Sequence, residues 1–234
     1  MIYPQLKNTP IKEIIFSISY DEIVDKSCFK KFIDLKEISE RFNDIKPSFL
    51  LEITNNGLKQ SIDNNNFHLR NRSEVLQLRK GALSYHYLGG YKKYSEVLDS
   101  IIELWTLFDS LTTENLTVNS LSIRYINVIE IDKDNPPSRL VQLYPKQSSD
   151  RNIINFQNSV NFNYVEFPNY NINVVSTKPK QNVVLLDISV SNKLIHPSTL
   201  ADDPKLFDAF KPLQEIKNKV FFDSITAKAL IRYI

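Results

Sequence analysis

Two long segments of the chain place an apolar residue at every second position, and this period constrains the fold more than any other feature. The first segment runs from Ile14 to Tyr20, and the second begins with Leu121. Successive side chains of a β-strand point to opposite faces, so the pattern predicts strands over residues 11–20 and 119–131. The second segment has apolar residues on both faces toward its end, which predicts a central position in a sheet.

Apolar residues at helical spacing predict four helices between the strands. These helices cover residues 34–46, 95–111, 139–144 and 203–221. Asp34 and Ser95 are suitable N-cap residues, and Pro204 stands at a first helical position, where proline is common. Pro212 predicts a kink or a break in the last helix. The final residues, 227–234, fit either a last strand or the tail of that helix.

The other regular segments are short β-like runs separated by turn residues such as Asn, Gly and Pro. They cover residues 49–54, 67–71, 74–79 and 83–88 in the first part of the chain, and residues 160–167, 171–176 and 183–190 in the second. Each part therefore contains a strand, a helix, an antiparallel meander and a long helix.

This order of elements predicts an α+β fold with two similar halves, residues 1–114 and 115–234, which together form one compact unit. The same order describes the TATA-binding-protein-like and helix-grip types of fold. In both types a curved antiparallel sheet wraps a long helix, and the other face of the sheet is free.

Several kinds of chemistry are excluded by what the sequence lacks. It contains four glycines, and only Gly89 and Gly90 are adjacent. Phosphate-binding loops and dinucleotide-binding turns need clustered glycines, so nucleotide chemistry by these two routes is excluded. One cysteine and three widely spaced histidines exclude the common zinc motifs. We therefore expect no metal and no cofactor.

Charge and hydrophobicity also bear on location and partners. The net charge is +2, which argues against strong non-specific binding to nucleic acid. The first ten residues lack the features of a signal peptide, and no apolar stretch is long enough to span a bilayer. Because Cys28 is the only cysteine, it has no internal disulfide partner. We expect a cytoplasmic protein with no membrane partner.

Three polar residues interrupt apolar strands and are the candidate binding residues. Arg124 and Asn127 lie in the long second strand, and Asp187 lies in a late strand. Burial of an unpaired charge is costly, so each residue should face water, a partner side chain or a ligand. An ion pair of Arg124 with Asp187 or with Glu13 is the simplest arrangement. A ligand-facing role and plain exposure to solvent stay open as alternatives.

Three segments of the sequence, Pro10–Glu13, Arg124–Asn127 and Phe222–Thr226, occur in a characteristic order and spacing. They resemble a sporadically distributed family of uncharacterised bacterial and archaeal proteins of similar length. The late strand Leu186–Val190 also looks like that of the family, and the resemblance spans the chain. It implies no established activity, cofactor or catalytic residue. A patchy distribution is common among accessory and defence systems, which favours a partner-binding role.

We therefore expect a soluble, non-enzymatic binding or regulatory protein that engages a protein partner. Nucleic-acid binding is an alternative, because aromatic residues lie near basic ones within residues 85–94 and 156–170. Such rings can stack on bases, and a curved sheet can form a saddle for duplex DNA. An enzyme of unrecognised type, with a site assembled by the fold, is a further alternative.

Overall fold

The computed structural model describes residues 3–4, 6–21, 26–54, 57–113, 115–131, 140–142, 157–180 and 182–234. Its strands are β1 (Ile11–Tyr20), β2 (Asp44–Thr54), β3 (Gly57–Arg70), β4 (Glu74–Arg79), β5 (Ala82–Tyr87), β6 (Val118–Glu130), β7 (Gln157–Tyr164), β8 (Phe167–Lys180) and β9 (Val183–Ser198). Its helices are α1 (Lys26–Ile33), α2 (Lys36–Arg41), α3 (Tyr94–Asp109), the 3₁₀ helix η2 (Leu206–Ala209), α4 (Phe210–Ser224) and α5 (Ala227–Leu230). The fold is α+β with a large antiparallel sheet, as the sequence predicts.

Hydrogen bonds join the described strands into one open sheet in the order β2-β3-β4-β5-β1-β6-β9-β8-β7. Each meander is antiparallel, from β2 to β5 and from β7 to β9. In the β2–β3 hairpin, Asp44 pairs with Arg70, and the register shifts between Pro47 and Ser48. Proline has no N–H group to donate, so an irregularity in the ladder is expected beside it.

The chain divides into two compact units. The first, called the α4 unit below, contains Met1–Ile14, Ser122–Lys193 and Ala209–Ile234. The second, called the α3 unit, contains Ile15–Leu121 and Leu194–Asp208. The division after Leu121 lies near the boundary expected between residues 114 and 115, and each unit also includes a short segment from the other part of the chain.

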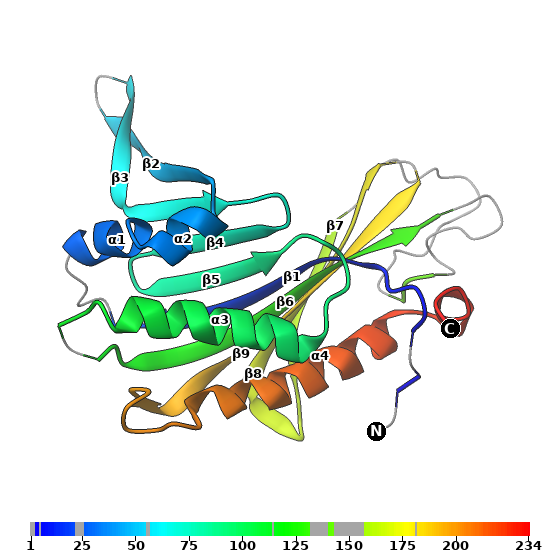
Figure 1. Ribbon diagram of the computed structural model, residues 1–234. Helices are drawn as coiled ribbons and strands as arrows, with labels where there is room; N and C mark the ends of the chain where they lie inside the picture. Colours follow the sequence, from blue (N-terminus) through cyan, green and yellow to red (C-terminus); the bar gives the residue numbers. More distant parts are fainter. Residues whose placement is uncertain are drawn as a thin grey trace. The chain divides into compact units, whose positions relative to one another are not determined.

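The core of the α3 unit forms around α3, which lies along β5 in Figure 1. One face of α3 is fully buried and consists of Val97, Ile101, Leu104, Trp105 and Phe108. The Trp105 ring lies 5.5 Å from that of Tyr20 on β1 and 6.4 Å from that of Phe207 on η2, between ring centroids. Burial of each large apolar side chain contributes about 1.5–3 kcal/mol.

A polar network, called the Glu74 network below, connects α2 to β4 and β5 in the α3 unit. The Glu74 carboxylate accepts hydrogen bonds from Arg41 Nη2 at 2.9 Å, Tyr85 Oη at 2.5 Å and Asn71 Nδ2 at 2.8 Å. Burial alone would raise the pKa of Glu74, but these bonds lower it to about 2. The network therefore holds a charged carboxylate beside a buried tyrosine.

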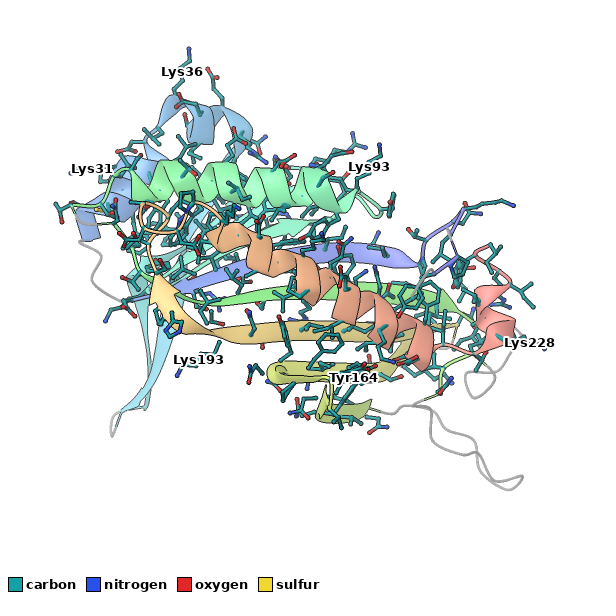
Figure 2. All side chains as sticks on the ribbon, turned by 90° about the horizontal axis from the view of Figure 1, so that it is seen from below. Lys31, Lys36, Lys93, Tyr164, Lys193 and Lys228 are labelled. Atoms are coloured by element: carbon teal, nitrogen blue, oxygen red, sulfur yellow. The ribbon has the colours of Figure 1, made fainter. Side chains whose placement is uncertain are left out.

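The core of the α4 unit lies between α4 and the strands β6, β8 and β9, which α4 crosses in Figure 2. The buried residues of α4 are Phe210, Leu213, Ile216, Lys217, Val220, Phe221 and Ser224. Alternate strand residues pack beneath them, as the two-residue period predicts, and include Tyr125, Ile172, Val174, Leu186 and Ile188. The other residues of these strands lie on the opposite face of the sheet.

The single helix predicted over residues 34–46 is wrong. Within these residues only α2 is helical, since α1 already ends at Ile33 and β2 begins at Asp44. Leu35 precedes α2 with extended backbone angles, φ −60° and ψ 137°, which separates the helices. Ile45 pairs with Leu69 of β3, so sheet pairing overrides the helical spacing of the apolar residues. Pro47 lies within β2 and does not end a helix.

Strand lengths also differ from the prediction. The strand expected at residues 67–71 extends back to Gly57, and β9 extends forward to Ser198. Backbone hydrogen bonds in a hairpin do not depend on apolar side chains, so polar segments continue the ladder. The β7–β8 turn lies at Val165 and Glu166 instead of at Pro168 and Asn169.

Helix ends show similar differences. α3 begins at Tyr94 with Lys93 as its N-cap residue, so Ser95 is not the cap. Pro212 lies in the first turn of α4, where its missing N–H removes no helical hydrogen bond. Near the C-terminus Ala227–Leu230 form α5, a separate short helix capped by Thr226, and no strand forms over residues 227–234. Of the helix predicted over residues 139–144, residues 139 and 143–144 lie outside the described residues, and residues 140–142 form no helix, because Val141 makes an isolated antiparallel bridge with Ile225. Residue 156, in one of the aromatic segments, also lies outside the described residues.

Candidate functional site

Two of the sequence-predicted binding residues meet on neighbouring strands of the α4 unit. Arg124 on β6 donates from Nε to Asp187 Oδ1 at 2.9 Å and from Nη2 to Oδ2 at 2.5 Å, which makes the pair bidentate. The hydrogen bond to Asp187 raises the pKa of Arg124, and the charge of Glu13 contributes in the same direction. The arrangement is that of a structural ion pair between β6 and β9.

Asn127 lies on the other face of β6, because it is three residues from Arg124 along the strand. Its side chain is buried, and Nδ2 donates to the carbonyl oxygens of Leu186 at 3.0 Å and Tyr125 at 3.3 Å. The structure therefore does not bring Asn127 together with the ion pair. A ligand-binding role for Arg124, Asn127, Asp187 or Glu13 stays a prediction.

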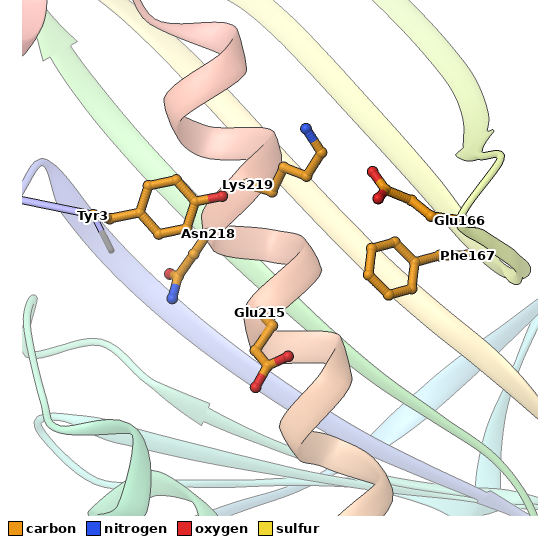
Figure 3. Close-up of a pocket in the computed structure, with 6 residues that line it drawn as sticks. All are labelled: Tyr3, Glu166, Phe167, Glu215, Asn218 and Lys219. Atoms are coloured by element: carbon orange, nitrogen blue, oxygen red, sulfur yellow. The ribbon is translucent and has the colours of Figure 1, made fainter. Parts of the chain in front are cut away.

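A pocket of about 400 Å³ in the α4 unit is the best candidate for a functional site. It lies between α4, the β7–β8 turn and the N-terminal segment, as the close-up in Figure 3 shows. Its lining residues are Tyr3, Glu166, Phe167, Glu215, Asn218 and Lys219. We refer to this feature as the α4 pocket.

Local structure explains how these side chains come together. Glu215, Asn218 and Lys219 are separated by three and four positions, so they share one face of α4. The β7–β8 turn carries Glu166, and β8 begins directly after it with Phe167, which places both beside that face. The ring of Tyr3 stacks on Phe222 of α4 with centroids 4.5 Å apart and nearly parallel planes.

The positive charge in the α4 pocket is already paired. Lys219 Nζ lies 3.1 Å from Asp223 Oδ2 and 4.5 Å from the centre of the Tyr164 ring. Tyr164 also donates a hydrogen bond to Asp223 at 2.7 Å. Burial raises the pKa of Tyr164, and its bond to Asp223 adds to the effect. The Tyr164 ring and the lysine are therefore held in place around the Asp223 carboxylate.

The negative charge in the α4 pocket is in excess. Glu166 and Glu215 are exposed and form no ion pair with any residue that the structure describes. Burial raises the pKa of Tyr3, and the negative charges of Asp223 and Glu166 raise it as well, whereas the positive charge of Lys219 lowers it. With Lys219 neutralised by Asp223, two carboxylates face the pocket beside the rings of Tyr3 and Phe167.

α4 also carries a buried lysine, Lys217, next to Asn218 of the α4 pocket. Lys217 Nζ donates to Asn218 Oδ1 at 2.6 Å and lies 4.0 Å from the centre of the Tyr125 ring. Its amine faces no carboxylate within the described residues, and burial lowers its pKa to about 7. A protein interior seldom holds a lysine without an acidic partner.

Sequence reasoning missed the residues of the α4 pocket. The spacing of Glu215, Asn218 and Lys219 on one helical face was a readable signal. Their meeting with Tyr3 and Glu166 depends on contacts between segments far apart in the chain, which no local pattern indicates.

The chain matches no protein-family model and no curated protein. The family resemblance of its three segments therefore stays a prediction. Within the described residues, no group of three or more His, Cys, Asp or Glu side chains is arranged to hold a metal ion. None of the helices described combines the length and the hydrophobicity needed to cross a bilayer.

Proposed function

We propose that the protein binds a partner protein, and that the α4 pocket takes a lysine or arginine side chain of that partner. The observation that carries the proposal is the pair of carboxylates, Glu166 and Glu215, beside the rings of Tyr3 and Phe167. Carboxylates form charge-assisted hydrogen bonds with ammonium and guanidinium groups. The face of an aromatic ring attracts the same cations by about 0.5–2 kcal/mol.

An exposed apolar residue favours a protein partner over a small amine. Val165, at the β7–β8 turn beside Glu166, has 99% of its surface exposed. A small cation in the α4 pocket would leave Val165 in water, whereas a protein surface can cover it. A buried apolar contact next to a charged pocket is a common arrangement at protein interfaces.

The proposal is tested by capturing partners from the native cell and then measuring the affinity of each purified partner. The pocket variant is Glu166→Gln with Glu215→Gln, and a second variant is Val165→Ser. The control variant is Glu37→Gln with Glu40→Gln, which neutralises two exposed carboxylates of α2 in the α3 unit.

We expect the pocket variant to lose about tenfold or more in affinity, since hydrogen bonds to charged groups contribute about 1.5–3 kcal/mol. Val165→Ser should also weaken binding, and the control should bind as the wild type does. Replacement of one lysine or arginine of the partner by alanine should produce the same loss as the pocket variant. A partner that binds the wild type and the pocket variant equally well would refute the proposal.

We also propose that the two halves of the chain are related by a topological repeat of the TATA-binding-protein-like type. The strand order supports this idea, because β1 and β6, the first strands of each half, are neighbours. From each of them the sheet continues with its own meander in reverse order, β5 to β2 on one side and β9 to β7 on the other. An experimental structure in which β1 to α3 does not superpose on β6 to α4 would refute the repeat.

Nucleic-acid binding has less support. Tyr85, one of the aromatic residues that suggested it, is fully buried, and Arg124 is neutralised by Asp187. A gel shift at low salt, where electrostatic binding is strongest, separates the two functions. The partner-binding proposal expects no shift with mixed DNA or RNA.

A further inference from the structure

The two edge strands of the sheet, β2 and β7, differ in their protection against pairing with a further strand. An edge strand offers unpaired N–H and C=O groups, and natural proteins block such edges with charged residues, proline or bulges. β2 carries Asp44, Lys46 and Pro47, and its register shifts directly after the proline. Further pairing at β2 is therefore disfavoured.

β7 lacks this protection along most of its length. Its sequence, Gln157–Tyr164, contains no charged residue and no proline. Its register with β8 is regular from Gln157 to Phe162 and shifts only between Phe162 and Tyr164, beside the turn. Among the described residues no strand pairs with the outer edge of β7. The strand is therefore a regular, uncharged edge that is open to a further strand.

We propose that β7 pairs in antiparallel fashion with β7 of a second copy of this chain, so that the two sheets become continuous. In a pair related by a two-fold axis, each residue lies opposite a residue of the same short strand. A charged strand would repel its own copy, whereas a strand that binds a different protein can carry charge and gain affinity from it. The absence of charge from β7 therefore favours a second copy as the occupant.

The sequence of β7 fits such a pairing. A two-fold axis at Val160 brings the regular part of the strand, from Asn158 to Phe162, into register with itself. Val160 then lies opposite Val160 of the second copy, on one face of the sheet. On the other face Ser159 lies opposite Asn161 of the second copy, and both residues are exposed in the single chain. No charges are brought together, and apolar and polar side chains each meet a neutral residue.

The β7–β8 pair already shows the contact that the second copy would repeat. On the face that carries Ser159 and Asn161, Asn173 of β8 lies between the two side chains. Its Nδ2 atom is 3.3 Å from Ser159 Oγ and 2.6 Å from Asn161 Oδ1. Amide and hydroxyl groups thus form a polar ladder across the strands, and the second copy continues this ladder beyond the edge.

The size of the interface sets the expected affinity. β7 has 8 residues, whereas a stable interface of standard size has about 20–30 residues on each side. We expect a reversible dimer with a dissociation constant of roughly 10–100 μM. The dimer is independent of the proposed partner, because no residue that lines the α4 pocket belongs to β7. Failure of either proposal therefore leaves the other intact.

The test is sedimentation of the full chain at concentrations up to about 500 μM, well above the expected dissociation constant. One variant is Ser159→Lys with Asn161→Lys, and the other is Ser159→Asp with Asn161→Asp. Each variant places like charges opposite one another in the dimer, so each alone should associate at least about tenfold more weakly than the wild type. An equimolar mixture of the two variants should restore the dimer, because unlike charges then lie opposite one another.

The control variant is Asn169→Lys with Asn171→Lys. It adds the same charge at two exposed positions of β8, one strand in from the edge, and should dimerise as the wild type does. Circular dichroism checks that all variants are folded. Hydrogen exchange of the wild type gives a measurement that needs no variant, since the amides of β7 should become more protected as concentration rises, while those of β2 should not.

A wild type that sediments as a monomer at about 500 μM would overturn the inference. So would a lysine variant that dimerises as well as the wild type, a mixture of the two variants that stays monomeric, or protection of β7 that is the same at low and high concentration. A control variant that dissociates would show that the dimer forms through a surface other than the β7 edge.

Discussion

Replacement of Lys217 by methionine should make the protein more stable. The lysine amine is buried between α4 and β6, where it contacts the Tyr125 ring and donates to the Asn218 amide oxygen. It faces no carboxylate of any described residue. Methionine has a similar unbranched shape and carries no charge, so it can fill the same space. The exchange removes the cost of holding an ammonium group, or of deprotonating it, in the core.

The size of the effect follows from the pKa of Lys217, which burial lowers from 10.5 to about 7. At roughly 1.4 kcal/mol for each tenfold change in an equilibrium constant, this corresponds to about 5 kcal/mol. Loss of the attraction between the ammonium group and the Tyr125 ring offsets about 1–2 kcal/mol. We therefore expect the free energy of unfolding to rise by about 3–4 kcal/mol at pH 7.

The stabilisation should depend on pH in one direction. Below pH 7 Lys217 is protonated in both states, so the cost of its burial is constant. Between pH 7 and pH 10.5 the folded state has lost the proton and the unfolded state retains it, so the wild type gains stability as pH rises. The advantage of Lys217→Met should therefore shrink by about 1.4 kcal/mol per pH unit across this range.

The assay is urea unfolding of the wild type and Lys217→Met at pH 7, 8 and 9. Other titrating groups contribute almost equally to the free energy of unfolding of both proteins, so their contributions cancel in the difference. Lys211→Met, at an exposed position of the same helix, is the control and should change stability by less than about 0.5 kcal/mol at every pH. A Lys217→Met protein that is less stable than the wild type at pH 7 would refute the reasoning. A difference that does not change between pH 7 and pH 9 would refute it as well.

Three further predictions concern stability. Glu74→Gln should lower the free energy of unfolding by about 2–3 kcal/mol at pH 7, because it breaks the Glu74 network. The stabilisation from Glu74 is complete above its ordinary pKa of 4.5 and is lost as pH falls toward 2, so urea unfolding of the two proteins should converge in acid. A double-mutant cycle with Arg124→Ala and Asp187→Ala should give a coupling of about 0.5–1.5 kcal/mol, since the arginine is 48% exposed and the aspartate 17%; no coupling would contradict the structural ion pair. Thr226→Ala should cost about 1 kcal/mol in thermal unfolding, because the threonine hydroxyl caps α5 by accepting from Ala229 N at 3.2 Å.

The parts of the fold that the sequence predicts best are those with an uninterrupted period. β1 and β4 have their predicted bounds, and α3 and β6 differ from theirs by one or two residues. In these elements each apolar residue of the pattern faces one core, so local preference and tertiary packing agree. β3 was predicted too short because its first residues are polar, and its pairing with β2 comes from the hairpin backbone.

The candidate site residues were likewise predicted from the sequence only in part. Arg124 and Asp187 stood out because each places a charge in an apolar strand, and pairing was the simplest way to satisfy both. The order of β6 and β9 in the sheet then brings them together. Glu166 and Glu215 did not stand out, because exposed carboxylates are common on any surface. Only the position of the β7–β8 turn beside α4 makes them neighbours.

Lys217 shows why a helical period can conceal a buried charge. The apolar stripe of α4 includes Leu213, Ile216 and Val220, and Lys217 stands four positions after Leu213, directly in that stripe. A lysine at the edge of such a stripe usually extends its amine into water. Here the Nζ atom is held by Asn218 and the Tyr125 ring beneath the helix, so the charge stays inside. The stripe alone is compatible with both outcomes, and what decides between them is the aromatic residue that β6 places under α4.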